Sequence, residues 1–276
     1  MTDRDADAAP SGEEAVSGEP DEIDPFAALD ALDAVAGSAD DPRDGNPVPE
    51  ADVRRMFDSI APVYDRMNSV LTLGLDGRWR RAAVAATGLR PADSVVDVAC
   101  GTGKLAALLA DRVGPFGRVR GIDLSPAMIE VATREYGDLV QLEFHVGNAL
   151  ALPFEADEFD AATIAFGIRN LADFVDGFRE LARVVRPGGT VVCLELSVPR
   201  PRWWGTIFHA SFRRLAPAIG GLMGHRDEYR YLPESLEGFP DPDRLANAMR
   251  IAGLGDVYWR GLGLGSVALH VGRVAG

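Results

Sequence analysis

Cysteine, histidine and lysine are scarce in this 276-residue chain, and each shortage narrows what the protein can be. The two cysteines, Cys100 and Cys193, cannot build a disulfide framework and lack the spacing of a metal-binding pair. The four histidines show no ligand spacing either, so we expect no metal site. Lys104 is the only lysine, and no basic cluster accompanies it, which argues against a nucleic-acid-binding surface.

Long apolar runs are also missing. No window approaches the roughly 18 apolar residues that a membrane-spanning helix needs. The first residues do not combine a basic segment with an apolar one, as a secretory signal does. We therefore expect a cytoplasmic protein, with peripheral contact at the inner face of a membrane as the open alternative.

Most of the net charge of −14 lies at the N-terminus, where residues 1–50 hold 15 acidic and two basic residues. This segment is rich in Asp, Glu, Ala, Pro and Gly, a composition that buries too little apolar surface to fold. We predict an acidic disordered tail over residues 1–50. Residues 51–276 are long enough for a single α/β domain with a sizeable core.

From residue 94 onward, short apolar runs alternate with helical periods, which predicts a doubly wound, mostly parallel α/β sheet of seven strands. The expected strands are Ser94–Cys100, Arg118–Asp123, Gln141–Val146, Phe159–Ala165, Thr190–Leu196, Asp256–Gly261 and Ser266–Gly272. The expected helices between them are Lys104–Val113, Pro126–Tyr136, Leu171–Val185 and Pro242–Ala252. Residues 51–90 are predicted to form an N-terminal helical cap and residues 198–240 a substrate-binding insert, because additions to such a sheet usually select the substrate.

The segment from Val95 to Gly103 indicates a binding site for a nucleoside cofactor. Its apolar run predicts a buried parallel strand, and Gly101 and Gly103 allow a tight turn that a ligand can approach closely. About twenty residues further on, Asp123 ends the next predicted strand, where a carboxylate can accept hydrogen bonds from both hydroxyls of a ribose.

Two classes of cofactor fit this loop, because Gly101-x-Gly103-x-x-Ala106 also satisfies the loose dinucleotide pattern. Asp97 favours S-adenosylmethionine (SAM), since a carboxylate there attracts its ammonium and sulfonium and repels a pyrophosphate. The alternative role for Asp97 is a cap on the amides of the loop. An NAD-dependent oxidoreductase therefore remains an alternative at this point.

The motifs together resemble the UbiE/MenG family, the SAM-dependent C-methyltransferases of menaquinone and ubiquinone biosynthesis. The resemblance is carried by residues 56–68, 97–103, 148–154, 166–170, 229–235 and 267–270. It implies the Rossmann-like class I methyltransferase fold, and it implies cofactor contacts from Thr102, Asp123, Asn148 and Ala149. For Asn148 the alternative is an Asn that stabilises its own turn. Ala165 departs from the family, some of whose members carry a hydroxyl residue there.

Methylation of a quinol ring carbon requires that the ring hydroxyl lose its proton or that its developing oxyanion be stabilised, because the pKa of a phenol is near ~10. Arg169, at the carboxyl end of the fourth predicted strand, is the candidate for the oxyanion, with Asn170 orienting the ring hydroxyl or a water. Alternatively, Arg169 pairs with Asp173 and Asn170 caps the following helix. For the base the open candidates are a polarised water and four side chains: Tyr64, Asp65, His225 and Tyr231.

Residues 200–215 place Trp204, Phe208, Phe212 and Leu215 at helical spacing among arginines. This stripe either receives a prenyl tail or rests on a membrane surface, or it simply faces the core. We predict an enzyme that methylates a prenylated quinol, with demethylmenaquinol as the expected substrate and a homodimer among the assemblies to test. The remaining alternatives are a benzoquinol or dual-ring methyltransferase, a methyltransferase of another lipid or small molecule, and a non-catalytic SAM-binding protein.

Overall fold

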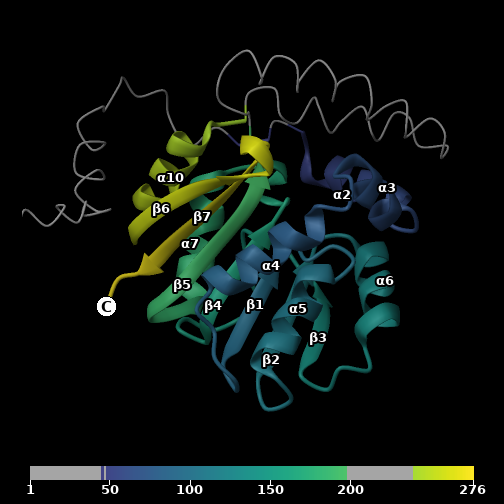
Figure 1. Ribbon diagram of the computed structural model, residues 1–276, viewed down its shortest axis with the longest axis horizontal. Coiled ribbons are helices and arrows are strands. Elements are labelled where there is room, and N and C mark those ends of the chain that lie inside the picture. The colour runs from purple at the N-terminus through teal and green to yellow at the C-terminus, as the bar shows by residue number, and fades with distance from the viewer. Residues whose placement is uncertain (1–44, 47, 198–238) are drawn as a thin grey trace, which may run out of the picture. The chain divides into compact units, whose positions relative to one another are not determined.

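The computed structural model describes residues 45, 46, 48–197 and 239–276 (Figure 1). Its helices are α2 (Glu50–Ile60), α3 (Tyr64–Leu71), α4 (Asp76–Ala86), α5 (Lys104–Val113), α6 (Pro126–Tyr136), α7 (Phe174–Val184) and α10 (Pro242–Ile251). Its strands are β1 (Ser94–Val98), β2 (Arg118–Asp123), β3 (Leu142–Val146), β4 (Phe159–Ala165), β5 (Val185–Leu196), β6 (Leu254–Leu262) and β7 (Val267–Val274). Two 3₁₀ turns, η1 (Ile168–Asn170) and η2 (Gly263–Gly265), complete the described elements.

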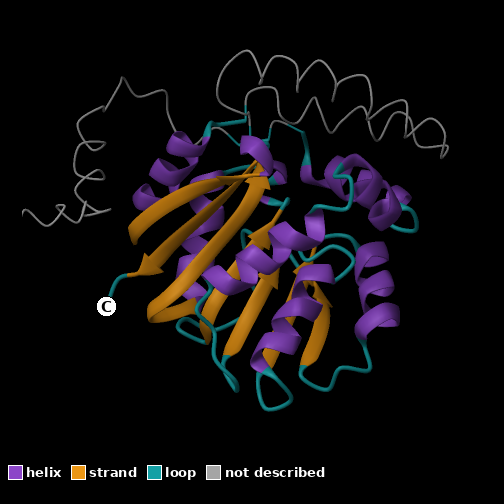
Figure 2. Cartoon of the chain, in the orientation of Figure 1, coloured by secondary structure: helices purple, strands orange, loops and turns teal. Residues whose placement is uncertain are grey.

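The strands form one sheet in the order β3-β2-β1-β4-β5-β7-β6 (Figure 2). β7 runs antiparallel to both of its neighbours, and the pairs from β3 to β5 are parallel. The chain proceeds outward from β1 in one direction and from β4 in the other, so the strand order reverses between these two strands. At such a switch point the carboxyl ends of the strands leave a crevice in which ligands bind.

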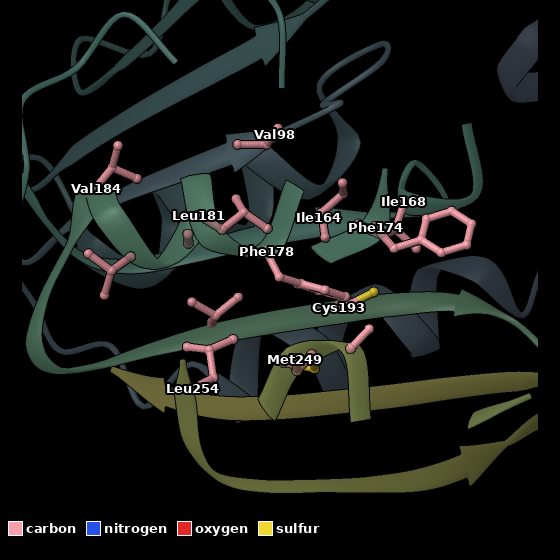
Figure 3. Packing of buried hydrophobic residues seen from close by; sticks show 14 of the residues in the cluster. Val98, Ile164, Ile168, Phe174, Phe178, Leu181, Val184, Cys193, Met249 and Leu254 are labelled. Carbon is pink, nitrogen blue, oxygen red and sulfur yellow. The ribbon is translucent and has the colours of Figure 1, made fainter. Parts of the chain in front are cut away.

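Helices cover both faces of the sheet. On one face α4 and α5 contribute Trp79, Ala83 and Leu109 to an apolar cluster with β1, β5 and β7. On the other face α7 packs against β4 and β5, and α10 packs against β6, β7 and α7. Figure 3 shows Phe178 and Met249 among the side chains of the apolar cluster on this face. Phe178 has no exposed surface, as expected of a large core residue.

Several predicted elements match the structure to the residue, namely α5, α6, β2 and β4. Their ends carry clear signals; for example, Ser125 caps α6 by accepting a hydrogen bond from the Met128 amide, and Pro126 follows it. α2 to α4 supply the helices expected over residues 51–90. The predicted tail, up to residue 44, and nearly all of the predicted insert, residues 198–238, lie outside the described residues.

The predicted bounds of β3, β6, β7 and α10 were wrong by one or two residues at one or both ends, and those of β1, α7 and β5 were wrong for identifiable local reasons. β1 ends at Val98, before Cys100, because Ala99 turns into the left-handed region with φ 52°. The helix predicted from Leu171 begins at Phe174, since the Asp173 side chain caps it by accepting from the Asp176 amide. β5 begins at Val185 rather than Thr190, because Val185 already pairs with Phe159 ahead of an irregularity in the β4–β5 register.

Candidate active site

A cleft of about 830 Å³, counting its open mouth, lies at the carboxyl ends of β1, β2 and β4. Its wall combines the loops after these strands with α2 and α3. The lining residues that matter below are Val48, Glu50, Tyr64, Ala99, Gly101, Asp123, Asn148, Ala149, Phe166 and Asn170. The cleft therefore occupies the switch point of the sheet, as the topology predicts.

The loop after β1 has an unusual backbone conformation. Ala99, Gly101 and Gly103 have φ values of 52°, 55° and 83°, in the left-handed region. At Gly103 any other residue would be strained, since φ lies in the left-handed region and a Cβ there would lie 2.8 Å from the ring of Phe144, which would have to shift. Left-handed conformations at non-glycine residues cost free energy and cluster at functional sites, and Phe166, at the end of β4, adds a fourth with φ 58°. The strained residues Ala99 and Phe166 both line the cleft.

Asp123 ends β2 at the wall of the cleft. Its carboxylate accepts hydrogen bonds from the Gly101 amide at 2.8 Å and from the Ser125 amide at 2.9 Å, one on each oxygen. Burial raises the pKa of this carboxyl to about 6 although both amides oppose the rise. Each oxygen keeps a lone pair, so the side chain can still accept hydrogen bonds from ribose hydroxyls.

Asp97, near the end of β1, is 1% exposed and lies beneath the lining of the cleft. Its Oδ1 accepts a hydrogen bond from the Thr163 hydroxyl at 2.6 Å, whereas Oδ2 has no hydrogen-bond partner within the described part of the chain. Burial raises the pKa of Asp97 to about 7; the Thr163 hydroxyl and, more weakly, the Ala106 amide oppose this rise. A buried carboxylate oxygen without a partner fits the ammonium of SAM, because an unmet acceptor is costly unless a ligand satisfies it.

Tyr64 and Asp65 are adjacent in α3, but only one of them lines the cleft. Tyr64 lines the cleft, and its ring packs edge-on against Phe57 with 6.1 Å between the ring centroids. Asp65 does not line the cleft and instead accepts a hydrogen bond from the Thr102 hydroxyl at 2.7 Å, with the Lys104 ammonium 3.5 Å away. Of these two candidate bases, only Tyr64 therefore reaches the space where a substrate would bind, and Asp65 ties α3 to the cofactor loop.

Asn148 and Ala149 follow β3 and line the cleft. Asn148 Oδ1 accepts from the Leu150 amide at 2.9 Å, which is the turn-stabilising role considered as the alternative. Its Nδ2 donates to Glu50 Oε2, also at 2.9 Å. Val48 and Glu50 fall within the predicted tail, yet they line the cleft, and the sequence held no signal for this contact across 98 residues.

Arg169 is buried away from the cleft. The side chain predicted to stabilise a substrate oxyanion is 3% exposed and does not line the cleft. It donates to Glu195 Oε1 at 2.5 Å and to the Phe166 carbonyl at 2.7 Å. The alternative partner, Asp173, was also wrong, because that residue caps α7. Arg169 thus attaches η1 to β5, while its neighbour Asn170 lines the cleft.

The sequence did not predict the roles of some residues that lie near the cleft. Asp58 on α2 accepts a hydrogen bond from the Ser125 hydroxyl at 2.5 Å, which joins the N-terminal helices to the start of α6. Arg80 on α4 is 8% exposed and its guanidinium lies over the ring of Phe166, 5.3 Å from the centroid. Arg80 is one of three arginines in residues 78–81, a pattern typical of a solvent-exposed helix face, so the sequence did not single out Arg80. His225, Tyr231 and residues 200–215 lie outside the described residues.

The strand order, the antiparallel seventh strand and the glycine loop at the switch point define the class I fold of SAM-dependent methyltransferases. The solved structure of a SAM-dependent methyltransferase from Aquifex aeolicus matches 71% of this chain and 89% of its own, with a TM-score of 0.55 and 18% identity. The [4+2]-cyclase SpnF matches 84% of this chain and 99% of its own, with a TM-score of 0.61 and 18% identity. Such likeness shows the fold and leaves the reaction open.

The sequence comparisons are more specific. Residues 46–274 match the ubiE/COQ5 methyltransferase family, and this chain belongs to that family. A demethylmenaquinone methyltransferase from Deinococcus radiodurans is 43% identical over 222 residues, covering 80% of this chain and 91% of the relative. One from Thermus thermophilus is 43% identical over 219 residues, covering 79% of this chain and 99% of the relative. One from Listeria monocytogenes is 37% identical over 226 residues, covering 81% of this chain and 95% of the relative.

Family membership confirms the resemblance to C-methyltransferases and makes the chain an enzyme that uses SAM as its methyl donor. It also removes the NAD-dependent oxidoreductase from consideration. Among the described residues no cluster of potential metal ligands occurs, and no helix there is both long and apolar enough to cross a membrane.

Proposed function

We propose that this protein transfers the SAM methyl group to a ring carbon of demethylmenaquinol, producing menaquinol. The observation that carries the proposal is the cleft at the switch point, with Asp123 in its wall and Asp97 beneath it, in a chain whose relatives are demethylmenaquinone methyltransferases. When bound, SAM supplies an activated methyl group whose transfer needs no covalent help from the protein. The residues of the chain therefore have to position the two reactants and control charge.

The donor end of the cleft is assigned to five groups. Asp123 accepts hydrogen bonds from the ribose, and Asp97 faces the ammonium. The backbone of residues 101–103 approaches the cofactor closely, with the Thr102 hydroxyl held in place by Asp65. Asn148 and Ala149 border the adenine, where Asn148 is already fixed by Leu150 and Glu50. Each assignment uses a side chain or amide whose present partners leave it able to bind a ligand.

The acceptor end is assigned to Tyr64 and Asn170, because both line the cleft. The Asn170 amide orients the ring hydroxyl, and the Tyr64 hydroxyl accepts the proton of that hydroxyl while it passes its own proton to water. After methyl transfer the ring carbon loses its hydrogen as a proton and the ring oxygen regains one, which restores the aromatic quinol. Arg169 acts indirectly, by fixing η1 and the Phe166 carbonyl so that Asn170 points correctly. It is a positioning residue, which replaces the oxyanion role expected from the sequence.

Two further parts of the proposal rest on sequence alone. The apolar and arginine-rich residues 200–215 receive the prenyl tail or contact a membrane surface, since a polyprenylated substrate lives in the bilayer. The homodimer remains a prediction. Sedimentation velocity at several protein concentrations can determine the oligomeric state.

The test is a competition between acceptor rings. The purified protein is incubated with methyl-labelled SAM and equal amounts of short-chain demethylmenaquinol and demethylated benzoquinol, both kept reduced. The proposal expects label in the naphthoquinol alone. Equal label in both products would indicate a dual-ring enzyme, and label in the benzoquinol alone would refute the menaquinone assignment.

A further inference from the structure

Two leucines project into solvent from turns at one end of the sheet. Leu73, between α3 and α4, is 87% exposed, and Leu264, in η2, is 79% exposed. Both residues have left-handed backbone conformations, with φ values of 51° and 58°. This conformation costs free energy at a leucine, and contact of the side chain with water adds a second unfavourable contribution. Two such residues on the surface therefore indicate a partner that receives their side chains.

Hydrogen bonds within each turn hold the leucines outward. In the first turn the Gly74 amide donates to the Ser69 carbonyl at 2.8 Å. In the second turn the Ser266 hydroxyl donates to the Gly263 carbonyl, also at 2.8 Å. The exposure of both leucines is therefore fixed by the fold.

Trp79 on α4 lies between the two turns. Its amide donates to the Leu75 carbonyl in the first turn at 3.2 Å, and a Cβ on Gly263 in the second would lie 2.7 Å from its ring. The second turn lies next to the carboxyl end of β5, because the Ser197 amide donates to the Ser266 carbonyl at 2.9 Å. Figure 1 shows this yellow turn beside the tip of the β5 arrow. Both turns are therefore at the end of the sheet where the cleft opens.

Helix α3 connects the first turn to the cleft. Tyr64 at the start of α3 lines the cleft, and Val70 near its end is 48% exposed. At 1.5 Å per helical residue, Leu73 lies about 14 Å from Tyr64. A ligand whose ring occupies the cleft can therefore keep an apolar tail close to the exposed leucines.

The exposed charges beside the first turn are all basic. Residues 66–81 hold four arginines and one acidic residue, Asp76, which is 6% exposed. Arg66, Arg78 and Arg81 are exposed, and none of them forms a hydrogen bond or an ion pair within the described part of the chain. The net charge of the whole chain is −14, so this region is opposite in sign to the rest. Exposed leucines among arginines are complementary to an anionic bilayer, whose headgroup region accepts the apolar side chains while its phosphates attract the guanidinium groups.

We propose that Leu73 and Leu264, together with Arg66, Arg78 and Arg81, form a docking edge that binds an anionic phospholipid surface and places the cleft beside the bilayer. The inference rests on the proposed function, in which a polyprenylated quinol must pass from the bilayer into the cleft. A second copy of the chain fits the docking edge less well, because a symmetric contact would bring the arginines of both copies together.

The experiment measures the binding of the full-length chain to lipid vesicles by cosedimentation. Vesicles with equal amounts of phosphatidylglycerol and phosphatidylcholine are compared with vesicles of phosphatidylcholine alone. The wild type is expected to bind the anionic vesicles about 10-fold or more tightly, and to lose this preference at high salt, because several arginines act on the charged surface. The variant L73N/L264N should bind the anionic vesicles about 10-fold more weakly than the wild type, because the two leucine side chains no longer enter the lipid.

Matched variants separate the docking edge from general effects. Asn is the replacement because it tolerates the left-handed conformation, so the two turns should stay folded. Phe116→Asn is the apolar control, since Phe116 is 89% exposed in the loop before β2, at the opposite end of the sheet, and it should bind like the wild type. R78Q/R81Q should weaken binding to anionic vesicles only, whereas Arg90→Gln, an exposed arginine beyond the other end of α4, should not.

Two results would overturn the inference. The first is a wild type that does not prefer the anionic vesicles, and the second is an L73N/L264N variant that binds them as well as the wild type does. A variant that changes the oligomeric state in sedimentation velocity, with vesicle binding unchanged, would instead identify the docking edge as a contact between copies of the chain.

Turnover of a short-chain demethylmenaquinol without vesicles distinguishes a failure of the docking edge from a failure of the proposed reaction. L73N/L264N should match the wild type in this assay, because its substitutions lie outside the cleft. Absence of turnover in the wild type would contradict the proposed reaction. Vesicle binding is measured without substrate, so it tests the docking edge separately.

Discussion

Replacing Arg169 by Met is expected to reduce stability first and activity only as a consequence. The Arg169–Glu195 pair is almost completely buried, with side chains 3% and 1% exposed. Removing one partner of such a pair leaves an uncompensated buried charge and typically costs about 3–5 kcal/mol. For a domain of this size each kcal/mol shifts Tm by about 2–4 °C, so the expected loss is on the order of 10 °C.

The double variant R169M/E195M separates stability from chemistry. Apolar replacement of both partners of a buried ion pair is often neutral in stability, so the double variant should recover most of the loss. Arg179→Met is the matched control, because its ion pair with Asp176 is about half exposed on each side and contributes about 1 kcal/mol or less. The assay is urea unfolding of all three variants beside the wild type, with kcat measured in parallel on demethylmenaquinol.

If Arg169 only positions η1, kcat recovers together with stability in the double variant. The reasoning would be refuted by an Arg169→Met protein that unfolds like the wild type but has lost most of its kcat. A double variant that is stable yet inactive would also contradict it, because turnover would then depend on the Arg169 guanidinium even where the fold does not.

Three other perturbations test separate parts of the structure. Asp97→Asn should raise the free energy of unfolding relative to wild type most at pH 8 and least at pH 3. The folded-state pKa of about 7 lies above the ordinary value of 3.8, so the buried carboxyl costs the wild type stability progressively as pH rises from 3.8 to about 7. A difference that is constant with pH in urea unfolding would contradict this, and SAM affinity should fall at pH 8. Removing residues 1–50 should weaken SAM binding, because Val48 and the Glu50–Asn148 hydrogen bond are lost, whereas removing residues 1–44 should not. Equal SAM affinities of the two truncated proteins, measured by calorimetry, would rule out a role for this contact. Gly103→Ala should abolish SAM binding or lower Tm by several degrees, since φ is 83° and the new Cβ would lie 2.8 Å from Phe144, and a variant with unchanged Tm and affinity would disprove the close fit.

Local signals predicted much of the fold. The cap and proline at Ser125 and Pro126 mark the start of α6, and the apolar run before Asp97 marks β1, because both depend on residues adjacent in sequence. The carboxylates of Asp97 and Asp123 were singled out in the same way, since they lie at the carboxyl ends of buried strands. Such features are set by neighbouring residues and are visible without the tertiary structure.

The missed features depend on contacts between distant segments. Glu195 is 26 residues from Arg169, and the two meet because η1 follows β4 and β5 lies next to β4 in the sheet. Glu50 reaches Asn148 across 98 residues only because α2 lies against the cleft. Arg80 looks like one arginine among several on a helix, and its importance is visible only from its burial. Pairings of this kind require the sheet order, which the pattern of one sequence does not specify in full.

The most direct test of the proposed reaction is the position of the transferred methyl group. Protein loaded with ¹³C-methyl SAM is mixed with one equivalent of reduced demethylmenaquinol, and the product is examined by NMR after a single turnover. The account predicts the ¹³C methyl on a ring carbon of the naphthoquinol, with the Asp123→Asn variant transferring more slowly under the same conditions. Label on a ring oxygen, or bound SAM that is never consumed, would contradict it.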